Sequence, residues 1–228
     1  MNDMVIEARG ISRGFRQGPK RVEVLRDIGL QVPAGTSMAI VGASGAGKST
    51  LLGLLAGLDV PSEGKIWLGN AEITSLDEDG RAALRADNVG FVFQSFHLIS
   101  SLTALENVMQ PLELAGAENA AEAALEAIGT VGLGPRKGHY PHQLSGGEKQ
   151  RVAIARAFVV QPAVLFADEP TGNLDKRTGD TVIDLLFKMN GETNTTLVLV
   201  THDLDLAARC DRVLYMDAGR IDREERID

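Results

Sequence analysis

One segment of the chain combines glycines, a lysine and hydroxyl side chains in a spacing suited to binding phosphate. Gly42-Ala43-Ser44-Gly45-Ala46-Gly47-Lys48-Ser49-Thr50 fits the pattern G-x-x-x-x-G-K-[ST] and lies between an apolar run and a leucine-rich run. Glycines allow successive backbone N–H groups to face one concavity, and the N-terminus of a following helix attracts anions. We therefore expect a phosphate-binding loop, in which Lys48 contacts the β- and γ-phosphates and Ser49 ligates Mg²⁺.

Two adjacent carboxylates, Asp168 and Glu169, follow the apolar run 163–167. Adjacent carboxylates at the end of a strand are most often solvated turn residues, but the phosphate-binding loop upstream favours a catalytic interpretation. The ends of parallel strands are where α/β sheets hold their ligands. Asp168 is expected to hold Mg²⁺, and Glu169 to orient and deprotonate an attacking water.

A third segment, 144–151, has the sequence Leu-Ser-Gly-Gly-Glu-Lys-Gln-Arg. Taken alone, it predicts a helix start, because serine is a good N-cap and two glycines loosen the loop before it.

The elements that must position these residues indicate an α/β fold. Four apolar runs without alternation are typical of parallel strands covered on both faces: 38–41, 89–93, 164–167 and 197–200. Short β-like segments over 4–32 and 64–68 predict a small antiparallel flank. We expect one domain over 1–228, with 4–94 and 160–228 as core and flank. About 95–159, rich in Ala, Leu and Glu, would be an inserted helical subdomain.

Composition excludes several classes of protein. The 228 residues carry a net charge of −8, which argues against a nucleic-acid binder and against a polybasic membrane anchor. Apolar runs are too short for a transmembrane helix, and the N-terminus does not read as a signal peptide. A single cysteine, Cys210, forbids an internal disulfide and a thiolate metal cluster. We expect a cytoplasmic protein that acts at a membrane only through a partner.

The order of the phosphate-binding loop, Gln94, 144–151, Asp168-Glu169 and His202 resembles the nucleotide-binding subunit of ABC transporters, over nearly the whole chain. The resemblance implies a P-loop ATPase core with a parallel sheet, an N-terminal antiparallel β flank and an inserted α-helical subdomain. It also implies ATP and Mg²⁺ as cofactors and ATP hydrolysis as the activity.

The resemblance also assigns roles to single residues. Phe15 would stack on adenine, although the family more often has tyrosine there. Gln94 would sense Mg²⁺ and the attacking water, His202 would contact the γ-phosphate, and Asp175 would belong to the loop that crosses to a second subunit. His97, His139 and His142 show no metal-ligand spacing.

In this family the serine-glycine segment acts on another copy of the chain. Ser145, Gly146 and Gly147 would complete the site around ATP held by the opposite subunit of a head-to-tail homodimer. Phe96, Leu98 and Ile99 would line a groove for a permease helix, or else pack inside the helical lobe; the sequence does not separate these interpretations.

Segments 90–94 and 166–175 resemble the bacterial group that serves lipoprotein release, macrolide export and cell division, and 93–96 and 207–212 are most similar to the YbbA-type ATPases. The resemblance implies ATP-driven dimer closure that powers an integral-membrane permease, in export or in lipid or lipoprotein handling. The subunit would lie on the cytoplasmic face of the inner membrane. A non-transport regulator of a cell-envelope process is the alternative. A DNA-repair ATPase would need coiled-coil arms between Thr50 and Ser145, where the chain has no sustained heptads.

Overall fold

The computed structural model describes residues 4–17 and 20–227, which fall into two compact units. Unit 1 comprises Met1–Arg85 and Thr196–Asp228, and unit 2 comprises Ala86–Thr195. Among the described residues, no helix is long and apolar enough to cross a membrane.

Unit 1 contains the antiparallel flank that the sequence predicts. Its strand order is β2 (Lys20–Pro33), β1 (Met4–Gln17), β4 (Glu63–Leu68) and β5 (Ala71–Glu72). Buried residues alternate along these strands, as at Ile6 and Ala8 in β1 and at Ile66 and Leu68 in β4. This period of two places one face of the sheet on the core.

The second sheet of unit 1 is built around β3 (Ser37–Gly42), which pairs in parallel with β8 (Thr196–Val200) and with β9 (Arg212–Asp217). The edge strand β10 (Arg220–Arg226) runs antiparallel to β9. Every residue of β8 is buried, and the helices α1 (Lys48–Leu55) and α7 (Leu204–Ala207) contact β3. The prediction of covered parallel strands is confirmed. The sequence did not predict the β9–β10 hairpin.

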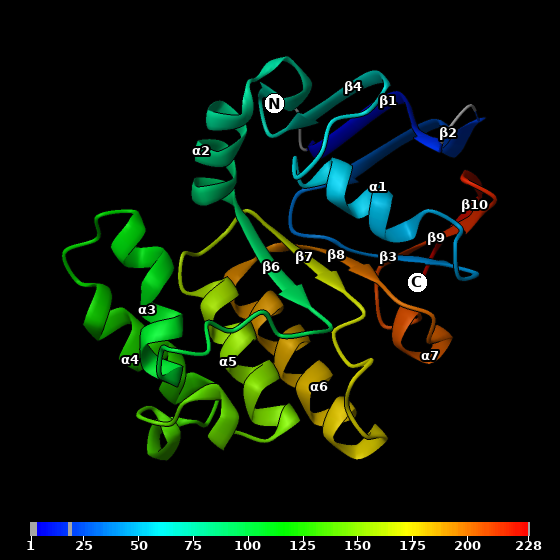
Figure 1. The fold of residues 1–228 in the computed structure, drawn as a ribbon. Helices are drawn as coiled ribbons and strands as arrows, with labels where there is room; N and C mark the ends of the chain where they lie inside the picture. The colour runs from blue at the N-terminus through cyan, green and yellow to red at the C-terminus, as the bar shows by residue number, and fades with distance from the viewer. Residues whose placement is uncertain (1–3, 18–19, 228) are drawn as a thin grey trace. The chain divides into compact units, whose positions relative to one another are not determined.

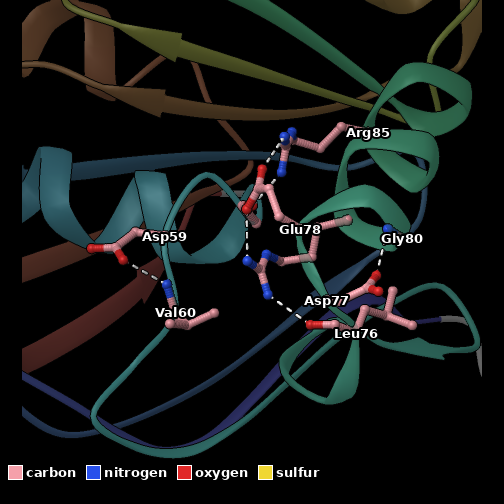
Figure 2. A network of polar contacts seen from close by, with 9 residues as sticks. Asp59, Val60, Leu76, Asp77, Glu78, Gly80 and Arg85 are labelled. Carbon is pink, nitrogen blue, oxygen red and sulfur yellow. Dashed lines mark hydrogen bonds and ion pairs between the residues drawn. The ribbon is translucent and has the colours of Figure 1, made fainter.

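Unit 1 also contains η1 (Ile73–Ser75) and the start of α2 (Glu78–Asn88). Charged side chains form hydrogen bonds and ion pairs at the start of α2 (Figure 2). Asp77 Oδ1 accepts from the Gly80 N–H at 2.9 Å, while Glu78 bridges Arg81 at 2.6 Å and Arg85 at 3.0 Å. The hydrogen bonds from these two guanidinium groups lower the pKa of Glu78. Arg85 also donates to the Gly57 carbonyl, which ties α2 to the loop after α1.

Unit 2 pairs β6 (Val89–Phe93) in parallel with β7 (Val164–Asp168). Figure 1 shows α5 (Gly146–Phe158) and α6 (Lys176–Thr193) side by side. The helical region that the sequence predicts consists of α3 (Ala104–Leu114), α4 (Ala120–Thr130), η2 (Gly134–Arg136), η3 (Pro141–Gln143) and α5. Helices α3 and α4 pack against each other and against α5.

A buried asparagine holds the entry to α3. Asn107 is fully buried, accepts from the Ile99 N–H at 2.8 Å, and donates to the carbonyls of Ile99, Leu102 and Thr103. Thr103 and Glu106 form a reciprocal capping box at the same helix start. The segment that follows Gln94 is therefore anchored to the helical region by satisfied backbone groups.

Candidate functional site

The phosphate-binding loop joins the buried strand β3 to α1. Gly47 has φ +98°, and a Cβ at this position would lie 2.8 Å from Leu25 Cδ2 and 3.0 Å from the Val24 carbonyl oxygen. Only glycine meets both the left-handed backbone and the close approach. Within the described part of the chain, no side chain caps the first turn of α1, and that turn carries no acidic residue. A helix start with neither a side-chain cap nor an acidic residue is suited to an anion.

Lys48 adds a positive charge at the first position of α1. Its Nζ donates to the carbonyl oxygens of Gly42 at 2.8 Å and Ala43 at 3.0 Å, so the ammonium group lies along the loop. The side chains that face solvent here include Ser44 and Ser49, while Thr50 is half-buried. These positions supply cationic, amide and hydroxyl donors to one small region, as phosphate recognition requires.

The turn between β9 and β10 contacts the phosphate-binding loop. The sequence did not predict this contact. The Gly219 N–H donates to the Ala46 carbonyl at 3.2 Å, and the Gly219 carbonyl accepts from the Arg26 N–H at 2.8 Å. Ala218 and Gly219 both have positive φ. A glycine between two short β-like runs is the only sequence signal for this turn, and it does not indicate what the turn contacts.

His202 lies just beyond β8 in the same unit as the loop. The parallel register pairs Ile40 with Val200, and the Thr201 N–H donates to the Ile40 carbonyl at 3.2 Å. The carboxyl ends of β3 and β8 therefore share one sheet edge, which brings the exposed His202 to the side from which the phosphate-binding loop starts. Asp203 caps α7 by accepting from Asp205 N–H at 2.9 Å.

Phe15, the expected adenine-stacking residue, lies on β1 with 45% of its surface exposed. The Arg13 guanidinium lies 4.8 Å from the centre of the Phe15 ring, and Arg13 also pairs with Asp59 at 2.6 Å. An exposed aromatic ring with a neighbouring guanidinium is suited to stacking on a flat base.

In unit 2 the register pairs Phe93 with Asp168, so Gln94 and Glu169 follow their strands at the same edge. Glu169 has φ +47°, in the left-handed region that residues other than glycine seldom adopt. Such strain costs on the order of 1 kcal/mol and is concentrated at functional sites. The turn after it is closed by the Gly172 N–H, which donates to the Glu169 carbonyl at 3.0 Å.

The serine-glycine segment forms the start of α5, as the sequence predicts. Ser145 Oγ accepts from the Glu148 N–H at 3.3 Å, and the Ser145 N–H donates to the Glu148 carboxylate at 2.8 Å. This backbone hydrogen bond is the main cause of the lowered pKa of Glu148, and Arg136 lies 3.2 Å from its carboxylate. A hydroxyl that caps through its oxygen keeps its hydrogen, so Ser145 can still donate to a phosphate.

A cavity of about 500 Å³ lies at the starts of α5 and α6. Asp175 Oδ1 caps α6 by accepting from the Thr178 N–H at 3.1 Å, and hydrogen bonds from Thr178 lower the pKa of Asp175. Two helix N-termini therefore meet the same cavity. It is lined by Ser145, Gly147, Glu148, Arg151, Asp175, Arg177, Thr178, Thr181 and Val182.

The donors expected for Mg²⁺ are chemically suitable. Ser49, Gln94 and Asp168 offer hydroxyl, amide and carboxylate oxygens, which are the ligands that this hard cation prefers. Among the described residues, no group of three or more His, Cys, Asp or Glu side chains is placed to hold a metal ion.

The glycine loop leads from β3 into α1, and β7 ends in an acidic pair. These two features are typical of a P-loop nucleotide-binding protein. A model of the family described as "ABC transporter" matches residues 25–172. The chain is 52% identical over 225 residues to YbbA of Escherichia coli (strain K12), described as an uncharacterized ABC transporter ATP-binding protein, with 96% of this chain and 97% of that protein covered. It is 49% identical over 223 residues to the lipoprotein-releasing system ATP-binding protein LolD of Legionella pneumophila (strain Paris), with 97% and 98% covered.

Among solved structures, the dimeric post-hydrolysis state of the ATP-binding cassette MJ0796 bound to ADP and Pi matches with a TM-score of 0.90 and 38% identity. The match covers 98% of this chain and 99% of that one. The chain belongs to the ABC transporter family, and it is an ATP-binding, ATP-hydrolysing subunit. The fold class and the resemblance to the YbbA and LolD group are confirmed.

Proposed function

We propose that two copies of this chain close head-to-tail on two ATP molecules, and that closure and reopening drive a membrane permease in lipoprotein or lipid handling or export. The lipoprotein-releasing system relative LolD supports the lipoprotein branch of this proposal, and the dimeric MJ0796 cassette supports the dimer. Each subunit would be peripheral, on the cytoplasmic face of the inner membrane, and held there by the permease.

The observation that carries the dimer is the start of α5. Ser145 is exposed, retains a hydroxyl hydrogen, and lines the cavity at the N-termini of α5 and α6. We infer that Ser145, Gly146 and Gly147 contact the γ-phosphate of ATP bound by the other copy, with Asp175 on the loop that crosses between subunits. The other copy would supply its phosphate-binding loop, 42–50, and Phe15 for adenine.

Hydrolysis then needs few protein groups. Glu169 accepts a proton from water, the water oxygen bonds to the γ-phosphorus, and the bond to the β–γ bridging oxygen breaks to give ADP and phosphate. Lys48 and His202 stabilise charge on the phosphate oxygens. Ser49, Gln94 and Asp168 would hold Mg²⁺, which neutralises phosphate charge when it is bound.

Mixed dimers test the shared site. Lys48→Ala removes one chain's phosphate-binding charge, and Ser145→Arg blocks one chain's serine-glycine segment. In a Glu169→Gln background, which should slow turnover and preserve ATP binding, we expect neither variant alone to dimerise with ATP. An equimolar mixture should give heterodimers with one intact site and about one ATP per dimer, because each site takes its two halves from different chains.

Size-exclusion chromatography with radiolabelled ATP reads out both the dimer and its nucleotide content. If each site were built within one chain, the mixture would give no dimer, and the head-to-tail arrangement would be wrong. The parent Glu169→Gln protein is the positive control.

The permease contact can be tested separately. Ile99 is 41% exposed, and neither Phe96 nor Leu98 is buried, so these three residues are available to a partner. We expect Ile99→Glu to abolish co-purification of the chain with its permease from detergent-solubilised membranes while ATP hydrolysis by the purified subunit is unchanged. Unchanged co-purification would exclude this groove.

A further inference from the structure

Gln94 and Asn173 form a reciprocal pair of amide contacts within unit 2. Asn173 Nδ2 donates to the Gln94 backbone carbonyl at 2.9 Å, and Gln94 Nε2 donates to Asn173 Oδ1 at 3.3 Å. We propose that Asn173 is a positioning residue, which selects the amide orientation of Gln94 that presents Oε1 to the bound cation. This inference rests on the proposed role of Gln94 at Mg²⁺.

The orientation of both side-chain amides follows from the Gln94 backbone carbonyl. A backbone carbonyl only accepts hydrogen bonds, so the Asn173 atom that faces it must be the NH₂ group. Asn173 Oδ1 must then face the Gln94 side chain, and an oxygen can only accept there. Gln94 therefore turns its NH₂ group toward Asn173 and leaves Oε1 for another partner. The orientation of a side-chain amide is assigned from its hydrogen-bond partners, and here the backbone carbonyl decides it.

The main chain beneath Gln94 is also fixed. Gln150 is fully buried in α5 and donates through Nε2 to the Phe93 carbonyl at 3.4 Å. Gly172 lies so close that a Cβ at this position would be 2.7 Å from Gln94 Nε2. In the loop after Glu169, Gly172 thus allows the close approach to the Gln94 amide, and Asn173 orients that amide.

The chemical consequence concerns cation affinity. Mg²⁺ binds carbonyl oxygen and gains nothing from an amide NH₂ group. If the side chain can turn or swing away, only a fraction of the population is competent, and the apparent cation affinity falls by that fraction. A hydrogen bond of ordinary net strength corresponds to roughly a 3- to 10-fold effect.

The test measures the Mg²⁺ requirement in the full-length chain. For Asn173→Ala we expect a rise of about 3- to 10-fold in the Mg²⁺ concentration for half-maximal ATP hydrolysis, with kcat at saturating Mg²⁺ close to that of the parent. Binding of Mn²⁺ to the ATP-loaded Glu169→Gln protein, followed by electron paramagnetic resonance, should weaken by the same factor without turnover. Asn119→Ala is the matched control, because Asn119 is an exposed asparagine at the start of α4, outside the proposed site.

A second background separates orientation from general damage to the loop. In Gln94→Glu both terminal atoms are oxygens, which cannot donate to Asn173 Oδ1, so Asn173 selects no orientation there and Asn173→Ala should not weaken the Mn²⁺ affinity. Equal Mn²⁺ affinity of Asn173→Ala and the parent would overturn the proposal, and so would the same loss in the Gln94→Glu background. If the parent chain showed no Mg²⁺-dependent turnover at all, the proposed role of Gln94 would fail instead.

Discussion

The helices α1 and α5 both begin in glycine-rich segments, but their first turns are completed in opposite ways. At α1 the residue before the helix is Gly47, with a left-handed backbone, and Lys48 follows it. At α5 the corresponding residue is Ser145, with an extended backbone, and Glu148 completes a capping box. Among the described residues, no side chain caps the first start, whereas the Ser145 side chain caps the second.

We propose that this difference assigns ATP binding to the start of α1 and the step after binding to the start of α5. We propose that the start of α1 supplies the affinity for ATP, because an anion there would lie near the Lys48 ammonium group and at an uncapped helix N-terminus. The start of α5 is already satisfied and carries a carboxylate, so it offers the phosphate little beyond the Ser145 hydroxyl hydrogen and nearby N–H groups. We expect loss of α1 contacts to weaken ATP binding, and loss of α5 contacts to slow the step that follows binding.

Lys48→Ala should have the largest effect, because it removes the charge at the ligand-dependent start. We expect ATP affinity to fall roughly 10- to 100-fold, since a hydrogen bond to a charged group contributes more than a neutral one. Isothermal titration calorimetry measures this directly. Lys188→Ala, which removes an exposed lysine paired only loosely with Glu192, should bind ATP like the parent. Equal affinities for both variants would contradict the role of α1.

Ser145→Ala compares two capping boxes within one chain. Thr103 and Glu106 form the same box at α3, so Thr103→Ala and Ser145→Ala should each lower the free energy of unfolding by about 1 kcal/mol. Only Ser145→Ala should also reduce ATP turnover, by roughly 10-fold, through loss of a hydrogen bond to a charged phosphate. Chemical denaturation and a steady-state ATPase assay report the two quantities. A Thr103→Ala protein with equally reduced turnover would show that capping alone explains the loss.

Gly147→Ala tests how tightly α5 and α6 meet. A Cβ on Gly147 would lie 2.4 Å from Thr178 Cγ2, so the substitution should lower the free energy of unfolding by about 1–3 kcal/mol. Thr178→Ser removes that methyl group and should restore most of the loss in the double variant. Thermal unfolding of the parent, the two single variants and the double variant gives the coupling, and purely additive effects would rule out this contact as the cause.

Glu148→Gln should have the smallest effect, since glutamine also fits a capping box. The pKa of Glu148 lies below its ordinary value of 4.5, so its charge stabilises the fold above that pH and this contribution disappears as pH falls through the lowered pKa. The variant should therefore be slightly less stable than the parent at pH 7, and this difference should be smaller at pH 4. Denaturation midpoints at the two pH values decide; a difference that grows toward acid would have the wrong sign.

The sequence predicted the parts of the fold that carry an apolar period or a glycine pattern. The buried strands, the antiparallel flank and the helical region all have such a signal, and the structure and the relatives confirm the fold and the family. Strand β10 was missed because an edge strand needs no apolar face. It is held instead by polar contacts, such as Arg212 with Glu224 and the Tyr215 hydroxyl with Glu225.

The roles of single site residues stay predictions, and two contacts at the site had no sequence signal. Gln94 and Asn173 are far apart in the sequence, and so are Ala46 and Gly219. A periodic pattern of residues therefore cannot predict either contact. Both contacts depend on backbone carbonyls, which every residue carries, so residue type alone does not indicate the partner. Such pairs become visible only when the tertiary fold is known.

The brace that Gly219 gives to the phosphate-binding loop has a consequence for biosynthesis. The ribosome makes 42–50 early, whereas the β9–β10 turn that donates to the Ala46 carbonyl is made near the end of unit 1's second segment. A nascent chain therefore carries the nucleotide-binding motif before it carries the residue that holds it in shape, and domains complete their folding as units. The order of translation thus delays the contact that holds this loop until β9 and β10 have been synthesised.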